Sequence, residues 1–542
     1  MIKDTKIIWF SAIFVLGYLI RLFFILELKD NYIFFFHPVI DASTAHKAAI
    51  NIANGDLFNR NVFIWQAPFY SYFLAAVYKL TSFMKAFTEH KAIYTVKMLQ
   101  ILIGSMNCFL ISYIGMKFFS RPVGILAGFI AALYGPFMVF EADLTGVVFH
   151  IFFNLCSLIL LLKAVEKKNS LLFLAAGGTI GLSALTVPNI MLFLPAACLW
   201  TFYHLEKSDN VYRKSSLQRK SLYLSSLIIA GCLIVILPWT ARNYIIEKTF
   251  IFISPNGGLN FFIGNNPDYE KTVNIRPGVE WDVLMSMPVI EVGVRYEESS
   301  NYYFRKSWEF IRSKPYDYFM LMWKKLYLFW HAEEVKRNQD MYTHREFSRI
   351  FSFLVWKNGI AFPFGIIGPL SIMGIILAIR NKGTPSLSMI FILLYMVSVV
   401  LFFVTDRYRI PVMPFLILYA SYAVVAEQQY LAQKKIINAL FVFLSLIPLI
   451  IFLNYGVNRG PRIDPEYYFF KGMVLMQQKD FRGAVDNLNT CTTLDPNNAE
   501  AFYRKGIAYQ HLDNKEQARQ TFQKAITLNP VYRDIVELKL EN

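Results

Sequence analysis

The sequence has few cysteines and few charged residues for its length. Its 542 residues include 5 cysteines and 17% charged residues. No two cysteines form a CxxC pair, and four of them lie inside apolar runs, which argues against a disulfide framework or a zinc site. The motifs GxxxxGK[ST], HExxH and a strand-linked GxGxxG are also absent. The sequence therefore shows no ATP-binding module, and any energy must come from an activated substrate or a gradient.

Apolar and aromatic residues dominate the chain instead. It is 55% hydrophobic, with 50 Phe, 31 Tyr and a mean hydropathy of +0.39. This is too apolar for a soluble fold, and runs of about 20 apolar residues can cross the ~30 Å core of a bilayer. The net charge of +16 does not indicate nucleic acid, because the basic residues cluster between apolar runs, as the positive-inside bias predicts. We expect an all-α, multi-pass protein, most simply of a bacterial inner membrane.

The apolar runs alternate with basic connectors. The runs cover residues 7–27, 68–84, 93–119, 122–137, 146–164, 170–186, 188–204, 221–240, 354–379, 385–404, 409–426 and 436–454. The connectors are Lys117 with Arg121, residues 163–168, residues 206–220 (with Arg213, Lys214, Arg219 and Lys220), residues 380–382 and Lys434 with Lys435. The first run lacks a small-residue cleavage site, so we interpret it as an uncleaved span and not a signal peptide.

The connectors also predict the orientation. All of them fall in the cytoplasm, with the N-terminus, if run 68–84 does not span. This run is short, begins with proline and carries several tyrosines, so we expect an interfacial helix at the outer surface. About eleven spans then remain, with residues 28–92 and 241–353 as outer loops. The odd count puts everything after residue 454 outside the cytoplasm.

The last part of the chain, residues 462–542, has a soluble helical pattern with a period of 34. Gly472 matches Gly506, and the same spacing relates three further pairs, Ala484 and Ala518, Leu494 and Leu528, and Pro496 and Pro530. This pattern resembles the tetratricopeptide repeat, with repeats at about 465–498 and 499–532. Two repeats are fewer than the three or so that bury a continuous core. We expect them to lean on the preceding domain or on a second copy of the chain, and to offer a site for a protein partner.

The outer segments collect most of the unusual polar residues. They include Asp41, His46, Lys47, Gln66, Tyr70, Glu141, Asp143, Asn189, Trp239, Arg242, His331, Arg407 and Arg409. Charges near the ends of spans are costly and are often kept for function. Each also has a structural interpretation: Asp41 as a helix N-cap, the acids at 141 and 143 as a solvated loop, and the arginines at 407 and 409 as anchors. The arginine pair would equally suit a lipid-linked phosphate, because the guanidinium fork matches phosphate oxygens.

The order of the polar motifs along residues 1–455 resembles a known family. Asp41 lies in the first outer loop, Gln66-Ala67-Pro68-Phe69-Tyr70 opens the interfacial run, and Tyr134-Gly135-Pro136 precedes the second acidic loop. The later motifs are Leu185-Thr186-Val187-Pro188-Asn189, Pro238-Trp239-Thr240-Ala241-Arg242-Asn243-Tyr244, Gly258-Leu259 with Gly264-Asn265-Asn266-Pro267, and Arg407-Tyr408-Arg409-Ile410-Pro411. Together they resemble the GT-C superfamily of integral-membrane glycosyltransferases, in its protein O-mannosyltransferase and lipid A aminoarabinose transferase branch.

The resemblance implies roles for particular residues. Asp41 matches the catalytic aspartate of the first loop, and Glu141 or Asp143 matches the second acidic position. Many relatives have a second acid directly after the first, where this chain has Ala42, so we expect Asp41 to act as a lone base. The usual arginine before Pro-Asn is Val187 here. The cavity candidates are His46, Lys47, Gln66, Tyr70, Asn189, Trp239 and His331.

We therefore expect transfer of a sugar from a polyprenyl-phosphate donor to a hydroxyl of a glycan, lipid or protein acceptor, with inversion. Asp41 would take the proton, and Arg407, Arg409 and Arg242 would stabilise the leaving phosphate. This chemistry requires no cofactor and no metal, and it leaves a divalent cation open. Two other functions stay open: a flippase of lipid-linked sugars, which predicts inverted repeats that we do not find, and a membrane-anchored scaffold. Deleting residues 462–542 should abolish the function of a scaffold and spare the basal transfer of an enzyme.

Overall fold

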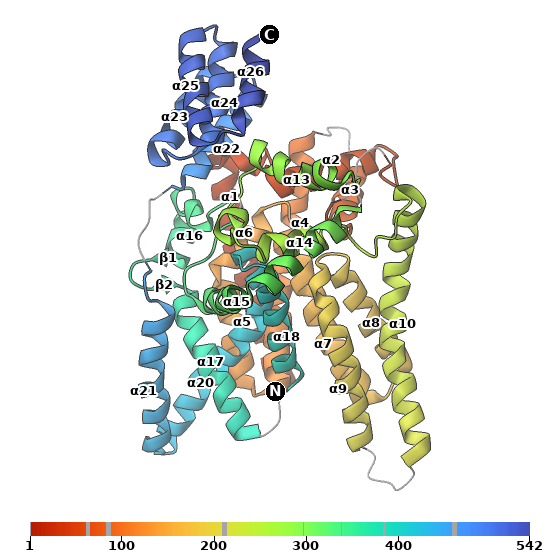
Figure 1. Ribbon diagram of the computed structural model, residues 1–542. Helices are drawn as coiled ribbons and strands as arrows, with labels where there is room; N and C mark the ends of the chain where they lie inside the picture. Colours follow the sequence, from red (N-terminus) through yellow and green to blue (C-terminus); the bar gives the residue numbers. More distant parts are fainter. Residues whose placement is uncertain are drawn as a thin grey trace.

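A computed structural model describes residues 2–60, 65–82, 88–208, 214–295, 298–337, 339–382, 386–457 and 463–541. Arg213 and part of the predicted 206–220 connector therefore lie outside the described residues. Long helices form the lower body of the molecule, shorter helices cover its upper end, and the C-terminal helices stand above them (Figure 1). The helices of the body are α1 (Ile2–Asn31), α4 (Glu89–Phe118), α5 (Arg121–Leu133), α6 (Gly135–Ala142), α7 (Val147–Lys167), α8 (Ser170–Ala184), α9 (Phe193–Ser208), α10 (Lys214–Glu247), α17 (Phe364–Lys382), α18 (Leu387–Leu401), α20 (Met413–Ala432) and α21 (Ile436–Leu453).

Each apolar run kept as a span in the sequence has a helix in this body. Among the described residues, seven helices are long and apolar enough to cross a membrane, or eight if the pair α5 and α6, bent by 51°, forms one span. Helices α8 and α18 are apolar but shorter. The protein is thus a multi-pass membrane protein, and the count of eleven spans stays a prediction. Small residues let the helices approach closely: a Cβ on Gly177 of α8 would overlap the backbone of Ile228 in α10.

The upper end is built from short helices of the two expected outer loops. The first loop supplies α2 (Ile40–Ala53) and α3 (Phe69–Ser82), which pack on each other. At 1.5 Å per residue, the 14 residues of α3 span about 21 Å, too short for a ~30 Å core. The second loop supplies α11 (Gly257–Gly264), α12 (Tyr269–Val273), α13 (Val279–Val292), α14 (Ser299–Ser313) and α15 (Pro315–Trp330), followed by η4 (Met341–Glu346), α16 (Arg349–Leu354) and two antiparallel strands, β1 (Trp356–Lys357) and β2 (Ala361–Phe362).

The C-terminal helices form two antiparallel pairs and a last helix. They are α22 (Pro465–Gln477), α23 (Phe481–Leu494), α24 (Ala499–His511), α25 (Lys515–Leu528) and α26 (Tyr532–Glu541). The aromatic residues Tyr467, Phe469 and Phe470 of α22 belong to the same buried core as Phe34 and Phe351 of the body. The first repeat therefore leans on the preceding domain, one of the two supports expected from the sequence.

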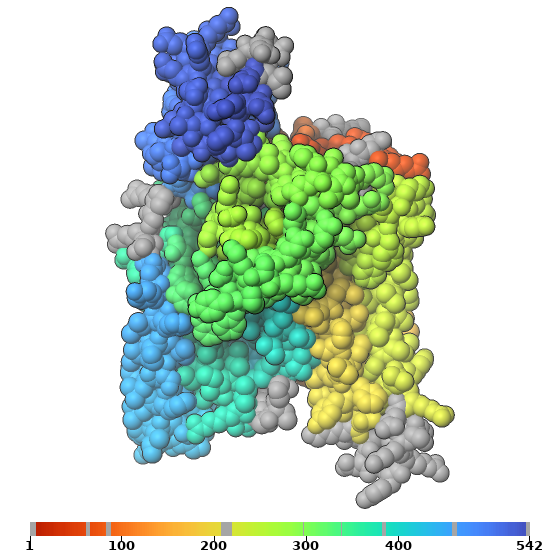
Figure 2. Space-filling view, viewed as in Figure 1, coloured from red at the N-terminus to blue at the C-terminus, as the bar shows by residue number. Residues whose placement is uncertain are grey.

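The second repeat contacts the connection between α12 and α13 and the first residues of α13, within the second expected outer loop. Val279 is buried among Tyr503, Phe522 and Tyr532 of the repeat, and its backbone N–H donates to the Glu500 carboxylate at 3.1 Å. Arg276 pairs with Asp495 of the preceding turn at 2.6 Å, and the Glu280 carboxylate accepts from Asn529 at 3.1 Å. Figure 2 shows the blue repeats resting directly on the green outer segment. The N-terminus and the repeats lie toward opposite ends of the molecule (Figure 1).

Candidate active site

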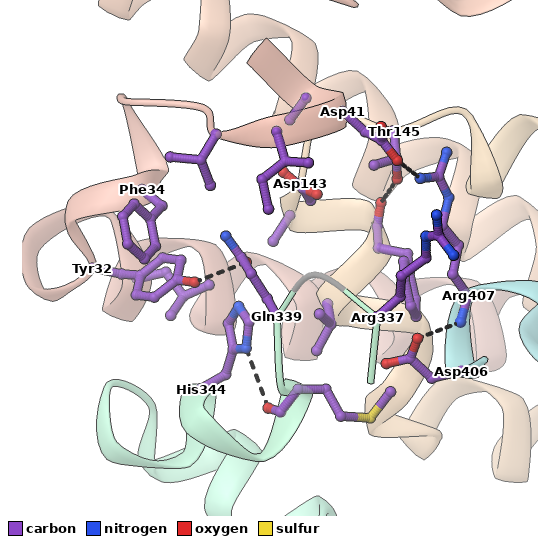
Figure 3. Close-up of a pocket in the computed structure, with 18 of the residues that line it drawn as sticks. Tyr32, Phe34, Asp41, Asp143, Thr145, Arg337, Gln339, His344, Asp406 and Arg407 are labelled. Atoms are coloured by element: carbon purple, nitrogen blue, oxygen red, sulfur yellow. Dashed lines mark hydrogen bonds and ion pairs between the residues drawn. The ribbon is translucent and has the colours of Figure 1, made fainter. Parts of the chain in front are cut away.

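A cavity of about 90 Å³ opens at the upper end of the body, beneath the outer helices. Its walls come from five parts of the chain that are far apart in sequence (Figure 3). These are the end of α1 with the start of α2, Lys97 of α4, the end of α6, the loop before η4 with η4 itself, and residues 405–408 ahead of α20. The cavity therefore forms only when both outer loops have folded over the helical body.

Asp41 and Arg407 form an ion pair in this cavity. The Arg407 guanidinium donates to Asp41 Oδ2, with a distance of 2.5 Å between Nη1 and the oxygen. Asp41 lies in the first turn of α2, but the helix N-cap is Val39, with no side-chain cap. The interpretation of Asp41 as an N-cap is therefore wrong: its carboxylate is directed to an arginine 366 residues away. The preceding residue, Ile40, has a φ of +54°, which is costly for a β-branched residue and is typical of functional sites.

The pair can be reached from two sides. A second cavity of about 40 Å³ shares Asp41, Thr145 and Arg407 with the first. Its other polar groups are the uncharged side chains of Gln66, Tyr70 and Thr186. The Tyr70 hydroxyl donates to Gln100 at 2.5 Å, and Gln100 in turn donates to the Asp143 carbonyl at 2.8 Å. A chain of hydrogen bonds thus joins a residue that lines the smaller cavity, Tyr70, to one that lines the larger, Asp143.

Three cations line the larger cavity: Lys97, Arg337 and Arg407. Lys97 donates to the Phe35 carbonyl at 2.7 Å. The Nη1 atom of Arg337 is buried, and within the described residues it has no hydrogen-bond partner. Burial lowers the pKa of Arg337, and the nearby Arg407 lowers it further. Figure 3 shows the two guanidinium groups beside each other. Buried cations of this kind are stabilised by an anion, so the wall suits a phosphate.

Two further carboxylates line the same cavity, Asp143 and Asp406. Asp143 follows the end of α6, and its Oδ1 accepts from the backbone N–H of Leu144 at 2.8 Å. Burial raises the pKa of Asp143, and Lys97 partly offsets this. Asp406 accepts from the backbone N–H of Arg407 and so fixes the turn that carries this arginine. His344 also lines the cavity, and burial lowers its pKa to about 4, so its imidazole is neutral.

Glu141 does not share this cavity. Its carboxylate pairs with Arg21 of α1 at 2.6 Å, and both side chains are almost fully buried. Of the two acids that matched the second acidic position, the structure brings only Asp143 to the cavity that contains Asp41. Glu141 instead joins α6 to α1.

Arg409 lies two residues beyond Arg407 but points elsewhere. Its guanidinium donates to the carbonyls of Phe329 and His331, at 3.1 and 2.5 Å, and pairs with Glu334. It also covers the ring of Phe364, 3.8 Å from its centre. Arg409 therefore fixes the end of α15 and does not line either cavity.

Arg242 also serves the packing of the outer loops. It donates to the carbonyls of Phe58 and Asn59, pairs with Glu247 at 2.8 Å and stacks on Trp239. His46 is likewise a packed residue, held by Tyr78 and Glu89 at 2.8 Å each. Of the other predicted cavity residues, Gln66 and Tyr70 line the smaller cavity, whereas the residues absent from both linings are His46, Lys47, Asn189, Trp239 and His331.

The sequence did not predict Lys97 or Arg337. Lys97 offered a signal, because it is an isolated cation inside an apolar run, where charges are rare and usually functional. Arg337 offered none, since it lies in an irregular loop with no periodicity. Among the described residues, no three histidine, cysteine, aspartate or glutamate side chains are grouped so that they could hold a metal ion.

Comparisons with known proteins identify the two C-terminal repeats. Residues 465–498 and 499–532 each match a family model described as "Tetratricopeptide repeat". No curated protein matches the sequence. In structure, the chain is similar to the archaeal oligosaccharyltransferase AglB from Archaeoglobus fulgidus, solved with an inhibitory peptide and a dolichol-phosphate. The identity is 14% and the TM-score 0.47, over 88% of this chain and 59% of AglB.

The chain is also similar to ArnT from Cupriavidus metallidurans. The apo form gives 15% identity and a TM-score of 0.41, over 98% of this chain and 78% of ArnT. The form bound to undecaprenyl phosphate gives 15% identity and a TM-score of 0.40, over 97% and 77%. The protein is thus an all-α, multi-pass membrane protein in which residues 465–532 form two tetratricopeptide repeats. The chain spans 59% of the length of AglB.

Proposed function

We propose that this protein transfers a sugar from a polyprenyl-phosphate donor to an acceptor hydroxyl at the outer face of the membrane. The observation that carries the proposal is the position of the Asp41–Arg407 pair between two cavities. The larger is lined by three cations and three carboxylates, and apart from the pair itself the polar lining of the smaller is uncharged. A reaction of this kind needs a base beside the hydroxyl nucleophile and cations beside the anionic leaving group.

The larger cavity suits the donor phosphate, because the guanidinium groups of Arg337 and Arg407 lie beside each other on its wall (Figure 3). Lys97, Arg337 and Arg407 supply three positive charges. The Nη1 of Arg337 has no hydrogen-bond partner in the part of the chain that the structure describes, so it offers a donor for a phosphate oxygen. When the phosphate enters, the Arg407 guanidinium binds it in place of the Asp41 carboxylate. Asp41 is then free to accept the proton of the acceptor hydroxyl. These cations meet the charge of the leaving group, so the reaction requires no cofactor.

The smaller cavity suits the acceptor hydroxyl. Gln66, Tyr70 and Thr186 offer hydrogen bonds without charge, beside the same Asp41. The acceptor oxygen attacks the anomeric carbon, its proton passes to Asp41, and the bond from that carbon to the phosphate oxygen breaks. Direct displacement inverts the anomeric centre and leaves polyprenyl phosphate as the second product. General-base assistance is worth about 10²–10⁴-fold, and preorganised cations contribute a comparable factor.

A transfer assay tests the proposal. The purified protein in lipid vesicles is given a series of undecaprenyl-phosphate sugars with membrane extract as the source of acceptor, and released undecaprenyl phosphate is measured. We expect acceptor-dependent release that continues in EDTA. Movement of the intact donor across the bilayer without release would instead identify a flippase. Mass spectrometry of lipid-linked and protein-linked glycans from a deletion strain then identifies the sugar and the acceptor.

A further inference from the structure

The first tetratricopeptide repeat packs against the wall of the candidate active site. Tyr467 of α22 stacks on Tyr32, with ring centres 6.1 Å apart, and meets Phe34 edge to face at 5.4 Å. Both partners line the cavity. Phe470 contacts Phe34 from the next turn of the helix, at 6.5 Å. The repeat and the cavity wall therefore share one layer of aromatic side chains.

The same helix holds the loop that carries Arg337. The neighbouring Lys336 pairs with Asp464 at 2.6 Å and approaches Glu466 at 3.6 Å. Asp464 is the N-cap of α22, where its other oxygen accepts from the backbone N–H of Glu466. Although burial lowers it, the pKa of Lys336 is raised by the carboxylates of Glu466 and Asp464. Asp464 is largely buried, so this pair is screened less than a surface pair.

Two hydrogen bonds fix the rest of the loop. The backbone N–H of Asp464 donates to the Thr343 hydroxyl at 3.2 Å, and the Tyr32 hydroxyl donates to Gln339 at 3.2 Å. The loop is thus held at Lys336, Gln339 and Thr343, and Asp464, the N-cap of the first repeat helix, supplies two of these three contacts. Arg337 lies directly beside the first of them and projects into the cavity (Figure 3).

We propose that the first tetratricopeptide repeat is part of the active site, where Asp464 and Glu466 act through Lys336 to position Arg337 for the donor phosphate. The claim that Arg337 is positioned for a donor phosphate rests on the proposed function. The anchoring of the loop by the repeat does not. Lys336 and Asp464 are positioning residues, since neither lines the cavity, and a displaced Arg337 would meet the phosphate in the wrong geometry.

Matched substitutions on the two sides of the contact test this. Lys336→Met removes the positive charge on the loop side of the ion pair. Asp464→Asn removes the negative charge on the other side but keeps a side-chain oxygen that caps α22. We expect each to raise the KM for the donor about 10-fold, with the double variant no worse than either single variant. Lys336→Arg should restore the donor KM. Lys306→Glu is the control, because Lys306 pairs with Glu291 away from both cavities.

Hydrogen–deuterium exchange gives a second readout that needs neither donor nor transfer. The backbone amides of Arg337 and residues 339–344 should exchange faster in Lys336→Met and Asp464→Asn than in the wild type or in Lys306→Glu. Unchanged exchange in both variants would overturn the proposal, whatever the protein transfers. Faster exchange with an unchanged donor KM would overturn the link to Arg337. A wild-type protein that releases no polyprenyl phosphate, but shows faster exchange in the variants, would overturn only the proposed function.

Discussion

Asp41 and Arg407 are 366 residues apart in the sequence, and their side chains form a 2.5 Å ion pair between two cavities. The pair joins the first turn of α2 to the turn that precedes α20. Its partly exposed side chains, 38% for Asp41 and 28% for Arg407, leave both groups open to a ligand. An ion pair with this much exposure contributes little to the stability of the fold, so stability alone does not account for it.

Arg407→Lys should separate charge from geometry. Lysine keeps the positive charge but lacks the planar fork that binds two phosphate oxygens at once, so we expect a higher donor KM and a lower kcat. Arg407→Ala should lower kcat/KM by about 10²–10³-fold, as the loss of a preorganised donor does elsewhere. Steady-state transfer kinetics measure both. Arg305→Ala, on the exposed face of α14, is the matched control, and equal losses in that variant would contradict a specific role for Arg407.

Glu141 and Asp143 should differ in what they support. Glu141→Gln leaves the guanidinium of Arg21 buried without its charge partner, which should cost about 3–5 kcal/mol of stability. Asp143→Asn should leave the unfolding temperature nearly unchanged and alter transfer, because Asp143 lines the cavity beside Asp41. Thermal unfolding in detergent and transfer kinetics measure the two effects. A reversed pattern would show that Glu141 is the second acid of the site.

Glu466 should make stability depend on pH. Burial raises the pKa of Glu466 to about 7, and Lys336 partly offsets this. A carboxyl whose pKa is raised on folding binds its proton more tightly in the folded state. Its effect is thus most favourable below its ordinary pKa, near 4.5, and is lost as the pH rises through about 7. The wild type should therefore lose stability between pH 5 and pH 8, whereas Glu466→Gln should not show this loss. Relative to the wild type, we expect Glu466→Gln to be less stable at pH 5 than it is at pH 8. A constant difference in unfolding temperature from pH 5 to 8 would contradict this.

Gly278 should be needed for the contact with the second repeat. Its φ of +133° suits glycine alone, and a Cβ there would overlap the Glu500 carboxylate. We expect Gly278→Ala to cost about 1–3 kcal/mol and to expose the repeats to limited proteolysis. Gly293→Ala is the control, because Gly293 has a φ of +66° and nothing within 4 Å of the added Cβ. Equal proteolysis of the two variants would show that backbone strain alone is responsible.

The sequence predicted the broad architecture because that information is local and periodic. Apolar runs, basic connectors and a 34-residue period each follow from a pattern along the chain. Asp41 was predictable for the same reason, as an isolated acid just after the first span. Its partner was less predictable: Arg407 and Arg409 are two residues apart on one helical turn, and such side chains point about 160° apart. No pattern in the sequence decides which of them faces the cavity.

The rest of the site depends on contacts between distant segments. Glu141 and Asp143 are separated by the end of α6 at Ala142, so one points to α1 and the other to the cavity. Arg337 owes its position to a loop and to the repeat that holds it. For the same reason, deletion of residues 462–542 does not distinguish an enzyme from a scaffold. It removes α22, which packs against the cavity wall, and we expect function to be lost from an enzyme as well as from a scaffold.

The most direct test of the central claim is Asp41→Asn in vesicles supplied with an undecaprenyl-phosphate sugar and acceptor. Asparagine keeps the size and the hydrogen bonding of the side chain but cannot take the proton of the acceptor hydroxyl. We predict that the variant still binds undecaprenyl phosphate, because Lys97, Arg337 and Arg407 are unchanged, and that transfer falls by about 10²–10⁴-fold. Transfer at the wild-type rate would contradict the assignment of Asp41 as the base.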